Sequence, residues 1–533
     1  MKNFLKSPYF VAVIAGAVAV LGYAPFGIFP LPVLALAVLF WLWSRAKHPT
    51  QAAWLGFAFG MGLFCAGIGW IYVALHTYGY MHPVLAALAT ALFAAVNATL
   101  PALAGYGQAK LKPFVVITGD LAAMPPSRTA SNSTSLSNHE RPPFDMLRAN
   151  GAWILLVMPS IWTLAEWLRG LLFTGFPWLA AGYSQVPNSP LAGYAPLLGV
   201  FGVSLSVAVS AGILLLLWNA RWSKPGRIGF AVLLVLWVSG GLLRLIDWTH
   251  PQGEPLKVSL LQGNVAQDTK FSEDALIGTL ETYRRLAQSS DARLVVMPET
   301  ALPLLRSNVP DYYQTMLGDH MRKNGGDILI GAFEKENGNY YNSVYSLGSA
   351  ESQHYRKDHL VPFGEFIPLR SVLGWFVNEV LNIPMGDLAS GGATQAPLNV
   401  AGQKVAVDIC YEDAFGEEII RALPQATLLV NVTNDAWYGE SHAAMQHNQL
   451  SQMRALETGR MMLRATNTGV TSVIGGDGRI QAMLPQFEEG VLTASVQGYV
   501  GSTPYVRFGN LGMLVLVGLM LLAAWRLNQH RRG

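Results

Sequence analysis

The chain has 533 residues, of which 51% are hydrophobic and 13% are charged, and its formal net charge is +3. Soluble domains are about 25% charged, so this balance indicates a chain that lies largely in lipid. The small net charge gives no reason to expect nucleic-acid binding, and the two cysteines, Cys65 and Cys410, are too few for a thiolate metal site. Cys65 lies in an apolar run and Cys410 follows a predicted strand, so we do not expect them to form a disulfide.

Eight apolar runs are candidates for bilayer-spanning helices, which need about 20 residues each. They are residues 8–24, 27–44, 52–76, 83–108, 151–168, 193–219, 228–246 and 508–526. The first run follows two lysines and resembles a signal peptide, but the spans after it favour an uncleaved helix.

Lys and Arg residues in the short connections gather on one side of the predicted membrane, which the positive-inside rule identifies as cytoplasmic. They are Lys2, Lys6, Arg45, Lys47, Lys110, Lys112, Arg221, Lys224, Arg227, Arg526, Arg531 and Arg532. Both termini are therefore predicted to be cytoplasmic. The predicted division is a membrane domain of seven helices (1–246), a periplasmic domain (247–507), an eighth span (508–526) and a cytoplasmic tail (527–533).

One segment of the predicted membrane domain differs from its surroundings. Residues 119–150 are rich in Ser, Asn, Pro and Arg and show no apolar periodicity. This composition predicts a disordered cytoplasmic insertion without a functional role.

Small and charged residues within the apolar runs need separate explanations. The third run carries Gly56, Gly60, Gly62, Gly67 and Gly69, which is typical of closely packed helices. Charges at a membrane boundary are costly unless they are paired or hydrated.

Such charges occur at the outer end of the fifth run, as Glu166 and Arg169. A structural ion pair is one interpretation. A substrate entrance is the other, and we favour it because Phe176, Pro177 and Trp178 follow in the same loop.

Residues 251–500 alternate short β-rich runs with helical patterns, which predicts a layered α/β domain. The predicted strands are 257–264, 293–298, 327–333, 341–347, 404–410, 427–433 and 470–474. The predicted helices are 272–289, 311–323, 415–422 and 442–461.

Reactive side chains in α/β domains tend to follow the ends of strands. Glu299 and Cys410 each follow an apolar strand, and Lys357 lies between them in the chain. A thiol with an ordinary pKa near 8.5 needs a base or a cation to become a good nucleophile. Glu299 can accept the thiol proton and return it to a leaving group, while Lys357 can stabilise an oxyanion.

Neighbouring residues can support such a site. Glu365 can hold Lys357 in position, and Tyr411 and Glu412 can shape the pocket beside the thiol. Each of these residues also has a structural explanation, since a buried cysteine, a capping carboxylate and a solvated lysine are common. Spacing alone does not show that they converge.

The segments around these residues resemble the nitrilase superfamily, whose catalytic set is Glu–Lys–Cys. The wider pattern resembles the apolipoprotein N-acyltransferase family. The matching segments are Gly22-Tyr-Ala-Pro-Phe26, Glu166-Trp-Leu-Arg-Gly170, Phe173-Thr-Gly-Phe-Pro-Trp178, Leu261-Gln-Gly-Asn264, His359-Leu-Val-Pro-Phe-Gly-Glu-Phe366, Asn434-Asp-Ala-Trp437 and Met453-Arg-Ala-Leu-Glu457. The resemblance implies an αββα nitrilase-like sandwich on a membrane body of eight transmembrane helices.

The resemblance also implies roles for individual residues: Glu299 as base, Lys357 as cation and Cys410 as nucleophile. The supporting positions it implies are Glu365, Tyr411, Glu412 and Asn342. Two features depart from the family pattern. The segment 119–150 has no counterpart, and Phe271 stands where many members carry a tryptophan, so an aromatic contact to lipid survives but an indole N–H does not.

No metal or cofactor site is predicted. His442 and His447 lack the i, i+4 spacing of a zinc pair, and no cysteine is near them in sequence. Asp477-Gly478 is typical of a hairpin turn rather than a phosphate-binding loop.

These features predict a multi-pass, monomeric enzyme of the bacterial inner membrane that forms a thioester on Cys410. The predicted partners are a membrane phospholipid as acyl donor and a diacylated apolipoprotein as acceptor, which accepts at its N-terminal amine. Two alternatives remain open. One is a membrane-tethered amidase with the same catalytic residues that hydrolyses a C–N bond. The other is a non-enzymatic lipoprotein-binding protein.

Overall fold

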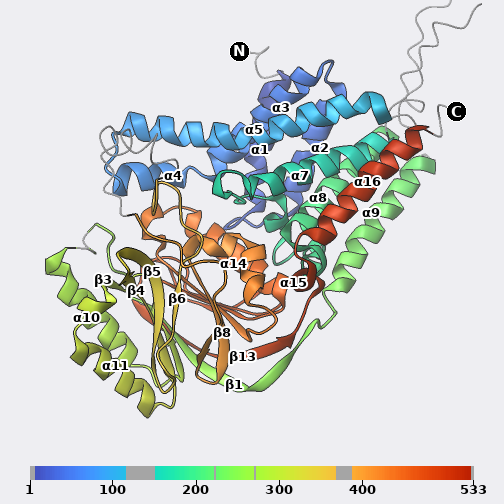
Figure 1. The fold of residues 1–533 in the computed structure, drawn as a ribbon. Coiled ribbons are helices and arrows are strands. Elements are labelled where there is room, and N and C mark those ends of the chain that lie inside the picture. The colour runs from blue at the N-terminus through green and yellow to red at the C-terminus, as the bar shows by residue number, and fades with distance from the viewer. Residues whose placement is uncertain are drawn as a thin grey trace, which may run out of the picture.

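The computed structural model describes residues 7–115, 151–220, 224–268, 270, 272–367 and 387–529. The predicted insertion at 119–150 and Phe271 lie outside these residues. Helices make up one half of the molecule and two β-sheets the other (Figure 1).

The helical half contains the long helices and several single turns. The long helices are α1 (Pro8–Ala19), α2 (Pro30–Arg45), α3 (Pro49–Gly67), α5 (Pro83–Val115), α7 (Met158–Arg169), α8 (Ala195–Ala220), α9 (Lys224–Leu243) and α16 (Leu511–Gln529). The short elements are η1 (Val20–Gly22), α4 (Trp70–Val73), η2 (Ala74–Tyr78), η3 (Trp153–Val157), η4 (Leu172–Thr174), η5 (Ala181–Gln185) and η6 (Pro190–Tyr194).

Apolar helices lie where the eight runs were predicted. By length and composition, three helices among the described residues can cross a membrane, namely Pro83–Lys112, Pro190–Asn219 and Gly226–Leu243. A fourth span is formed if Pro49–Gly67 and Trp70–Tyr78, bent by 52°, count as one. Pro8–Gly22, Pro30–Arg45 and Leu511–Leu527 are shorter apolar helices, and η3 with α7 occupies the remaining run. The helical nature of the runs is confirmed, while the number of spans stays a prediction.

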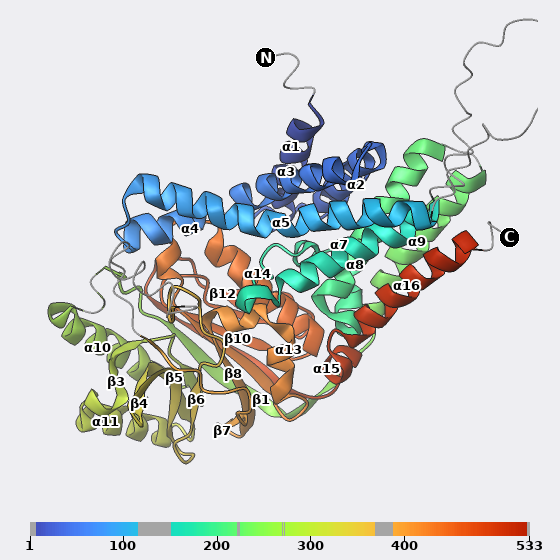
Figure 2. The same cartoon turned by 45° about the horizontal axis from the view of Figure 1, so that its top comes forward.

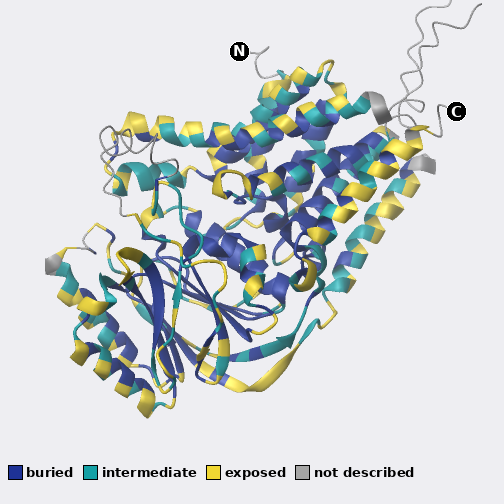
Figure 3. Cartoon of the chain, viewed as in Figure 1, coloured by how far each residue is buried: buried dark blue, intermediate teal, exposed yellow. Residues whose placement is uncertain are grey.

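The outer surfaces of several of these helices are apolar. Val235 on α9, Leu88 on α5 and Leu519 on α16 are all more than half exposed. Figure 3 shows exposed residues along the outer faces of α9 and α16. Exposed apolar faces of this extent are unfavourable in water and suit a lipid environment.

The glycines of α3 allow close packing, as predicted. A Cβ on Gly56 would lie 2.2 Å from the backbone oxygen of Pro101 in α5, and one on Gly62 would lie 2.0 Å from that of Val13 in α1. Gly60 is similarly close to Ala98, whereas Gly69, which lies just beyond α3, meets only the backbone oxygen of Cys65 at 3.6 Å. Helix α3 therefore fits between α1 and α5 because most of these positions carry no side chain.

The other half is a sandwich of two sheets. The seven-stranded sheet has the order β13-β1-β2-β4-β5-β6, with β3 paired to β4, and the six-stranded sheet has the order β12-β11-β10-β9-β8-β7. The strands are β1 (Thr249–Gln262), β2 (Leu294–Val296), β3 (Leu302–Leu305), β4 (Asp327–Glu336), β5 (Asn339–Gly348), β6 (His354–Arg356), β7 (Leu398–Val400), β8 (Gln403–Ile409), β9 (Leu428–Thr433), β10 (Met462–Thr466), β11 (Ser472–Ile474), β12 (Ile480–Met483) and β13 (Gly490–Gly501).

Helices cover both outer faces of the sandwich, which gives the expected αββα layers. They are α10 (Glu273–Gln288), α11 (Asp311–Lys323), α13 (Gly416–Ile419), α14 (Ala443–Thr458) and α15 (Pro504–Phe508), with the single turns η7 (Arg306–Asn308), η9 (Cys410–Ala414), η10 (Ile420–Ala422) and η11 (Asp435–Tyr438). Helices α10 and α11 lie on the side away from the helical body, whereas α14 lies between the sheets and that body (Figures 1 and 2).

All seven predicted strands and all four predicted helices of this domain are present, with shifted ends. The predicted helix 442–461 ends early, at Thr458, because Gly459 adopts a left-handed conformation (φ 63°) and the chain then enters β10. The Asp477-Gly478 turn connects β11 to β12, as predicted. Strands β3, β6, β7, β10, β12 and β13 were not predicted.

Candidate functional site

Cys410 occupies the turn that follows β8. Its backbone has a positive φ of 58°, a conformation that is unfavourable for any residue with a side chain and that redirects the chain into η9. The side chain is buried, and the backbone oxygen accepts a hydrogen bond from Asn431 Nδ2 at 3.1 Å. The turn therefore fixes the thiol just beyond the carboxyl end of a parallel-paired strand.

Glu299 follows β2 and is held by two donors. Its Oε1 accepts from Asn342 Nδ2 at 2.7 Å, and its Oε2 accepts from the backbone N–H of Asn434 at 2.9 Å. Lys357 Nζ is 3.9 Å from Oε1. Asn434 follows β9 in the opposite sheet, so the glutamate side chain bridges the two layers of the sandwich.

Lys357 follows β6 and is only 1% exposed. Its Nζ donates to Glu365 Oε1 at 2.9 Å, and the same oxygen accepts from Asn342 Nδ2 at 3.2 Å. Burial alone lowers the pKa of Lys357, but the carboxylate of Glu365, together with Glu299 and the Cys410 sulfur, raises it above its ordinary value. Lys357 therefore remains a cation throughout the physiological pH range.

The thiol of Cys410 is electrostatically linked to this set. Burial, followed by the carboxylate of Glu299, raises the pKa of Cys410 well above its ordinary value, while Lys357 and a hydrogen bond from Thr433 act in the opposite direction. The resting thiol is therefore protonated, and a thiolate forms only as the proton leaves. This arrangement of a neutral thiol, a carboxylate and a buried ammonium suits covalent acyl chemistry.

Glu412 lies close to Cys410 in sequence, but its carboxylate is hydrogen-bonded to other groups. Its Oε1 accepts from the backbone N–H groups of Asp358 and His359 at 2.7 and 3.0 Å, and its Oε2 accepts from that of Ile409 at 2.6 Å. The hydroxyl of Tyr355 contacts both oxygens at 3.0 Å. The carboxylate therefore fastens the segment after Lys357 to the Cys410 turn. Burial raises the pKa of Glu412 to about 7, although Lys357 and the backbone donors oppose this.

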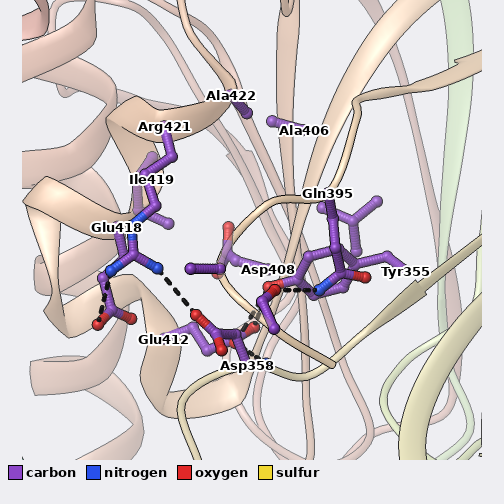
Figure 4. A pocket seen from close by; sticks show the side chains of 13 residues that line it. Tyr355, Asp358, Gln395, Ala406, Asp408, Glu412, Glu418, Ile419, Arg421 and Ala422 are labelled. Atoms are coloured by element: carbon purple, nitrogen blue, oxygen red, sulfur yellow. Dashed lines mark hydrogen bonds and ion pairs between the residues drawn. The ribbon is translucent and has the colours of Figure 1, made fainter. Parts of the chain in front are cut away.

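Glu412 also lines a cavity of about 50 Å³ (Figure 4). Arg421 lies on one wall, with Nη1 2.8 Å from Asp358 and Nη2 3.6 Å from Glu418. Cys410 is not among the described residues that line the cavity. The cavity therefore lies against Asp358 and Glu412, which support the site, rather than against the Cys410 thiol.

Tyr411 connects the Cys410 turn to the helical body. Its hydroxyl donates to the backbone oxygen of Gly175 at 3.2 Å, and its ring stacks on Phe176 and Trp178, each with centroids 6.3 Å away. Trp178 is 1% exposed and donates from Nε1 to Gln446 at 2.8 Å. An aromatic wall thus joins the loop after α7 to the thiol.

Glu166 and Arg169 hold that loop in place. Glu166 accepts from Trp162 Nε1 at 3.0 Å and from the backbone N–H of Ala181 at 3.0 Å. Arg169 donates to the backbone oxygens of Phe176 and Trp178, the latter at 2.6 Å. Both side chains are buried, and their hydrogen bonds to the backbone fix the conformation of the loop. They do not form an open surface.

Two residues at the site received no role from the sequence. Asn434 binds Glu299 through its backbone N–H, so its side-chain type gave no signal, and only the matching segment Asn434-Asp-Ala-Trp437 pointed to this position. Lys270 is buried, donates to Thr300 Oγ1 at 2.8 Å and lies 3.4 Å from the backbone oxygen of Glu299. Burial lowers the pKa of Lys270 to about 8, against the opposing effect of Glu299. A lone lysine in a loop gives no sequence signal for such a contact.

Known protein families match both halves of this chain. Residues 15–213 match the family described as apolipoprotein N-acyltransferase N-terminal domain, and residues 257–505 match the family described as carbon-nitrogen hydrolase. An apolipoprotein N-acyltransferase from Nitrosomonas europaea is 48% identical, with 95% of each chain covered. One from Chromobacterium violaceum is 42% identical, covering 98% of this chain and 94% of the relative. A solved CN-hydrolase superfamily structure from Xanthomonas campestris is 18% identical with a TM-score of 0.35, covering 50% of this chain and 97% of that one.

Proposed function

The chain belongs to the apolipoprotein N-acyltransferase family, and from that premise we propose that it moves an acyl chain from a membrane phospholipid to the N-terminal amine of a diacylated apolipoprotein. The reaction passes through a thioester on Cys410. The observation that carries this proposal is the buried ion pair of Glu299 and Lys357, whose charges both act on the Cys410 thiol at the face of an apolar helical body.

The first half-reaction forms the thioester. Glu299 takes the thiol proton as the sulfur attacks an ester carbonyl of the phospholipid, and Lys357 stabilises the oxyanion that develops. The carbon–oxygen bond to the glycerol then breaks. Glu299 returns the proton to the departing oxygen, which leaves as a lysophospholipid.

The second half-reaction uses the same groups. The neutral α-amine of the acceptor attacks the thioester carbonyl, and Glu299 takes a proton from the amine. The carbon–sulfur bond breaks, an amide forms, and the proton returns to Cys410. Asn342 and Asn434 hold Glu299 in place for both steps, and Glu365 does the same for Lys357.

The position of the thiol favours lipid substrates over small amides. Tyr411 bonds to Gly175, and Tyr183 in η5 donates to the backbone oxygen of Ala414, just after the nucleophile, at 3.1 Å. Acyl chains can therefore remain among the helices while the reacting ester reaches Cys410. In this arrangement Trp178, Glu166 and Arg169 shape the side from which lipid approaches.

A transfer assay tests the function against the amidase and the binding-protein alternatives. Purified protein given a labelled phospholipid and a diacylated lipopeptide should yield a labelled amide on the lipopeptide amine. An acetyl-capped lipopeptide, which lacks a free amine, is the matched control and should stay unlabelled. Release of labelled fatty acid without any amide would support a hydrolase, and an unchanged phospholipid would support a binding protein.

We further propose an inner-membrane protein with eight spans, divided at residues 1–246, 247–507, 508–526 and 527–533. The apolar helices and their exposed apolar faces support this division. Helices α1 and α16 have their outer ends on the side of the helical body away from the sheets, which supports a shared side for both termini (Figure 2).

The topology has a direct test. A phosphatase reporter fused after residue 300 should be active only outside the cytoplasm, and a fluorescent reporter fused after Gly533 should be active only inside it. The same reporters exchanged between the two sites are the controls and should be inactive. The opposite pattern at either site would overturn the eight-span topology.

A further inference from the structure

A closed ring of four charged side chains lies beneath the Cys410 turn. His447 Nε2 is 3.0 Å from Asp413 Oδ1, and His447 Nδ1 is 2.8 Å from Asp435 Oδ1. Arg464 closes the ring, 3.0 Å from Asp413 Oδ2 and 3.1 Å from Asp435 Oδ2. All four side chains are at most 1% exposed, so none of these charges is compensated by water.

The partners of His447 determine its protonation state. Its Nδ1 faces a carboxylate oxygen, and its Nε2 faces a second carboxylate oxygen and, at 3.2 Å, the backbone oxygen of Cys410. A carbonyl oxygen can only accept, and so can an ionised carboxylate. Both ring nitrogens must therefore carry a proton, which makes His447 an imidazolium and the ring of four charges neutral overall.

Electrostatics agree with this assignment. Burial and Arg464 lower the pKa of His447, but Asp413 and Asp435 outweigh them and raise it to about 9. Burial raises the pKa of Asp435, but His447 and Arg464 bring it below its ordinary value, so this carboxyl is ionised. The remaining face of the His447 ring packs on Trp178, with centroids 5.4 Å apart.

The ring connects the two groups that exchange the proton. At one end, His447 donates to the backbone oxygen of Cys410, in the turn with positive φ. At the other end, it holds Asp435, and the preceding residue, Asn434, donates its backbone N–H to Glu299. A shift of either the Cys410 turn or the Asn434–Asp435 segment would change the distance between the Cys410 thiol and the Glu299 carboxylate.

We propose that His447 is a positioning residue that acts as a protonated clamp between the Cys410 turn and the Asn434–Asp435 segment that holds Glu299. The inference rests on the proposed function for its chemistry, but the clamp itself is a property of the resting protein. The stability that the clamp contributes is fully present below about pH 6.5, the ordinary pKa of histidine, and is lost as the pH rises through about 9.

The protonation state can be measured without a substrate. In protein labelled with ¹⁵N-histidine, one histidine should keep both ring nitrogens protonated at pH 8, where an ordinary histidine is neutral. This signal should be absent from His447→Gln and present in His442→Gln, the matched control, since His442 is an exposed residue at the start of the same helix. A wild-type spectrum without an imidazolium at pH 8 would overturn the proposal.

The positioning role is measured on Cys410. His447→Gln should slow acylation of Cys410 by phospholipid about 100-fold, the effect expected when reacting groups are displaced by about 1 Å. Alkylation of Cys410 by iodoacetamide should slow as well, because Asp435 without its imidazolium partner raises the pKa of the thiol further, while His442→Gln behaves as the wild type in both assays. A wild-type protein that alkylates but never acylates would refute the proposed function and leave the clamp standing. Normal rates in His447→Gln would refute the clamp.

Two further results separate a charge clamp from simple packing. The wild-type acylation rate should fall as the pH rises through about 9, and His447→Gln should lack this decline, while any contribution of Lys270 near pH 8 persists in both. Adding Asp413→Asn to His447→Gln removes the excess negative charge and should restore the acylation rate by about tenfold. A pH decline shared by both proteins, or no gain in the double variant, would show that His447 acts only by filling space.

Discussion

Replacing Cys410 by alanine should abolish formation of an acyl-enzyme, because the sulfur of Cys410 carries the acyl chain in the proposed reaction. Alanine adopts the same strained turn at φ 58° at no greater cost, so the fold should persist. Cys410→Ser should fail as well, because an alkoxide is far harder to generate than a thiolate, even with Glu299 as base. Intact-protein mass spectrometry after incubation with phospholipid measures the adduct directly.

The chain offers a matched control for this experiment. Its only other cysteine, Cys65, is exposed on α3. Cys65→Ala should acylate at the wild-type rate and leaves Cys410 as the sole thiol, so any thioester is assigned without ambiguity. An adduct of acyl mass on the Cys410→Ala protein would contradict Cys410 as the nucleophile.

Replacing Glu299 by glutamine should slow acyl-enzyme formation by at least about 100-fold, the usual minimum contribution of a general base. The thiol of Cys410 is protonated at rest because burial and the Glu299 carboxylate raise its pKa, so it cannot react without an acceptor for its proton. Glutamine has nearly the same shape but presents only one accepting oxygen. Either the Asn342 amide or the Asn434 N–H therefore also loses its partner. Single-turnover acylation with labelled phospholipid measures the rate.

Glu334 provides the control for this substitution. It is as buried as Glu299 and is ion-paired with Arg306 and Arg356, but it lies on β4 and does not contact Cys410. Glu334→Gln should therefore acylate within a few-fold of the wild type, even if it melts at a lower temperature. If Glu299→Gln acylated as fast as Glu334→Gln, another group would have to be the base.

Removal of the Glu299 carboxylate has a second consequence for the thiol. That carboxylate is one cause of the raised pKa of Cys410, whereas Lys357 lowers it. The Glu299→Gln thiol should thus ionise at a lower pH than the wild-type thiol and alkylate more readily, although its acylation is slower. Opposite changes in the two rates would separate loss of the base from collapse of the site.

Local patterns in the sequence were sufficient to predict the broad architecture. Apolar runs of about 20 residues predict lipid-embedded helices wherever they occur, and all eight runs contain helix. Alternation of β-rich and amphipathic segments predicted every strand that carries a site residue except β6. Short edge strands such as β7 and β12 were missed because three or four residues hold too little periodicity.

Motif resemblance selected residues that the fold then brought together. Glu299, Asn342, Lys357 and Glu365 lie within one set of hydrogen bonds and ion pairs, although 66 positions separate the first from the last. Spacing could not predict this contact, because it depends on which strands pair and in which register. Spacing was insufficient for Glu412 as well. Its position close to Cys410 suggested a side chain that shapes the pocket, but its carboxylate accepts hydrogen bonds from backbone N–H groups.

The sequence by itself therefore determined the lipid-embedded and layered halves of the chain, since these depend on composition and short periodicities, while its motif resemblance indicated the chemical types at the site. Only the tertiary structure decided how the halves meet, through Tyr411 on Gly175 and Tyr183 on Ala414, and which buried groups lie behind the thiol. His447 shows the physical reason. In sequence it is one histidine on a helix, but two carboxylates, an arginine and a carbonyl brought from three other segments determine its charge.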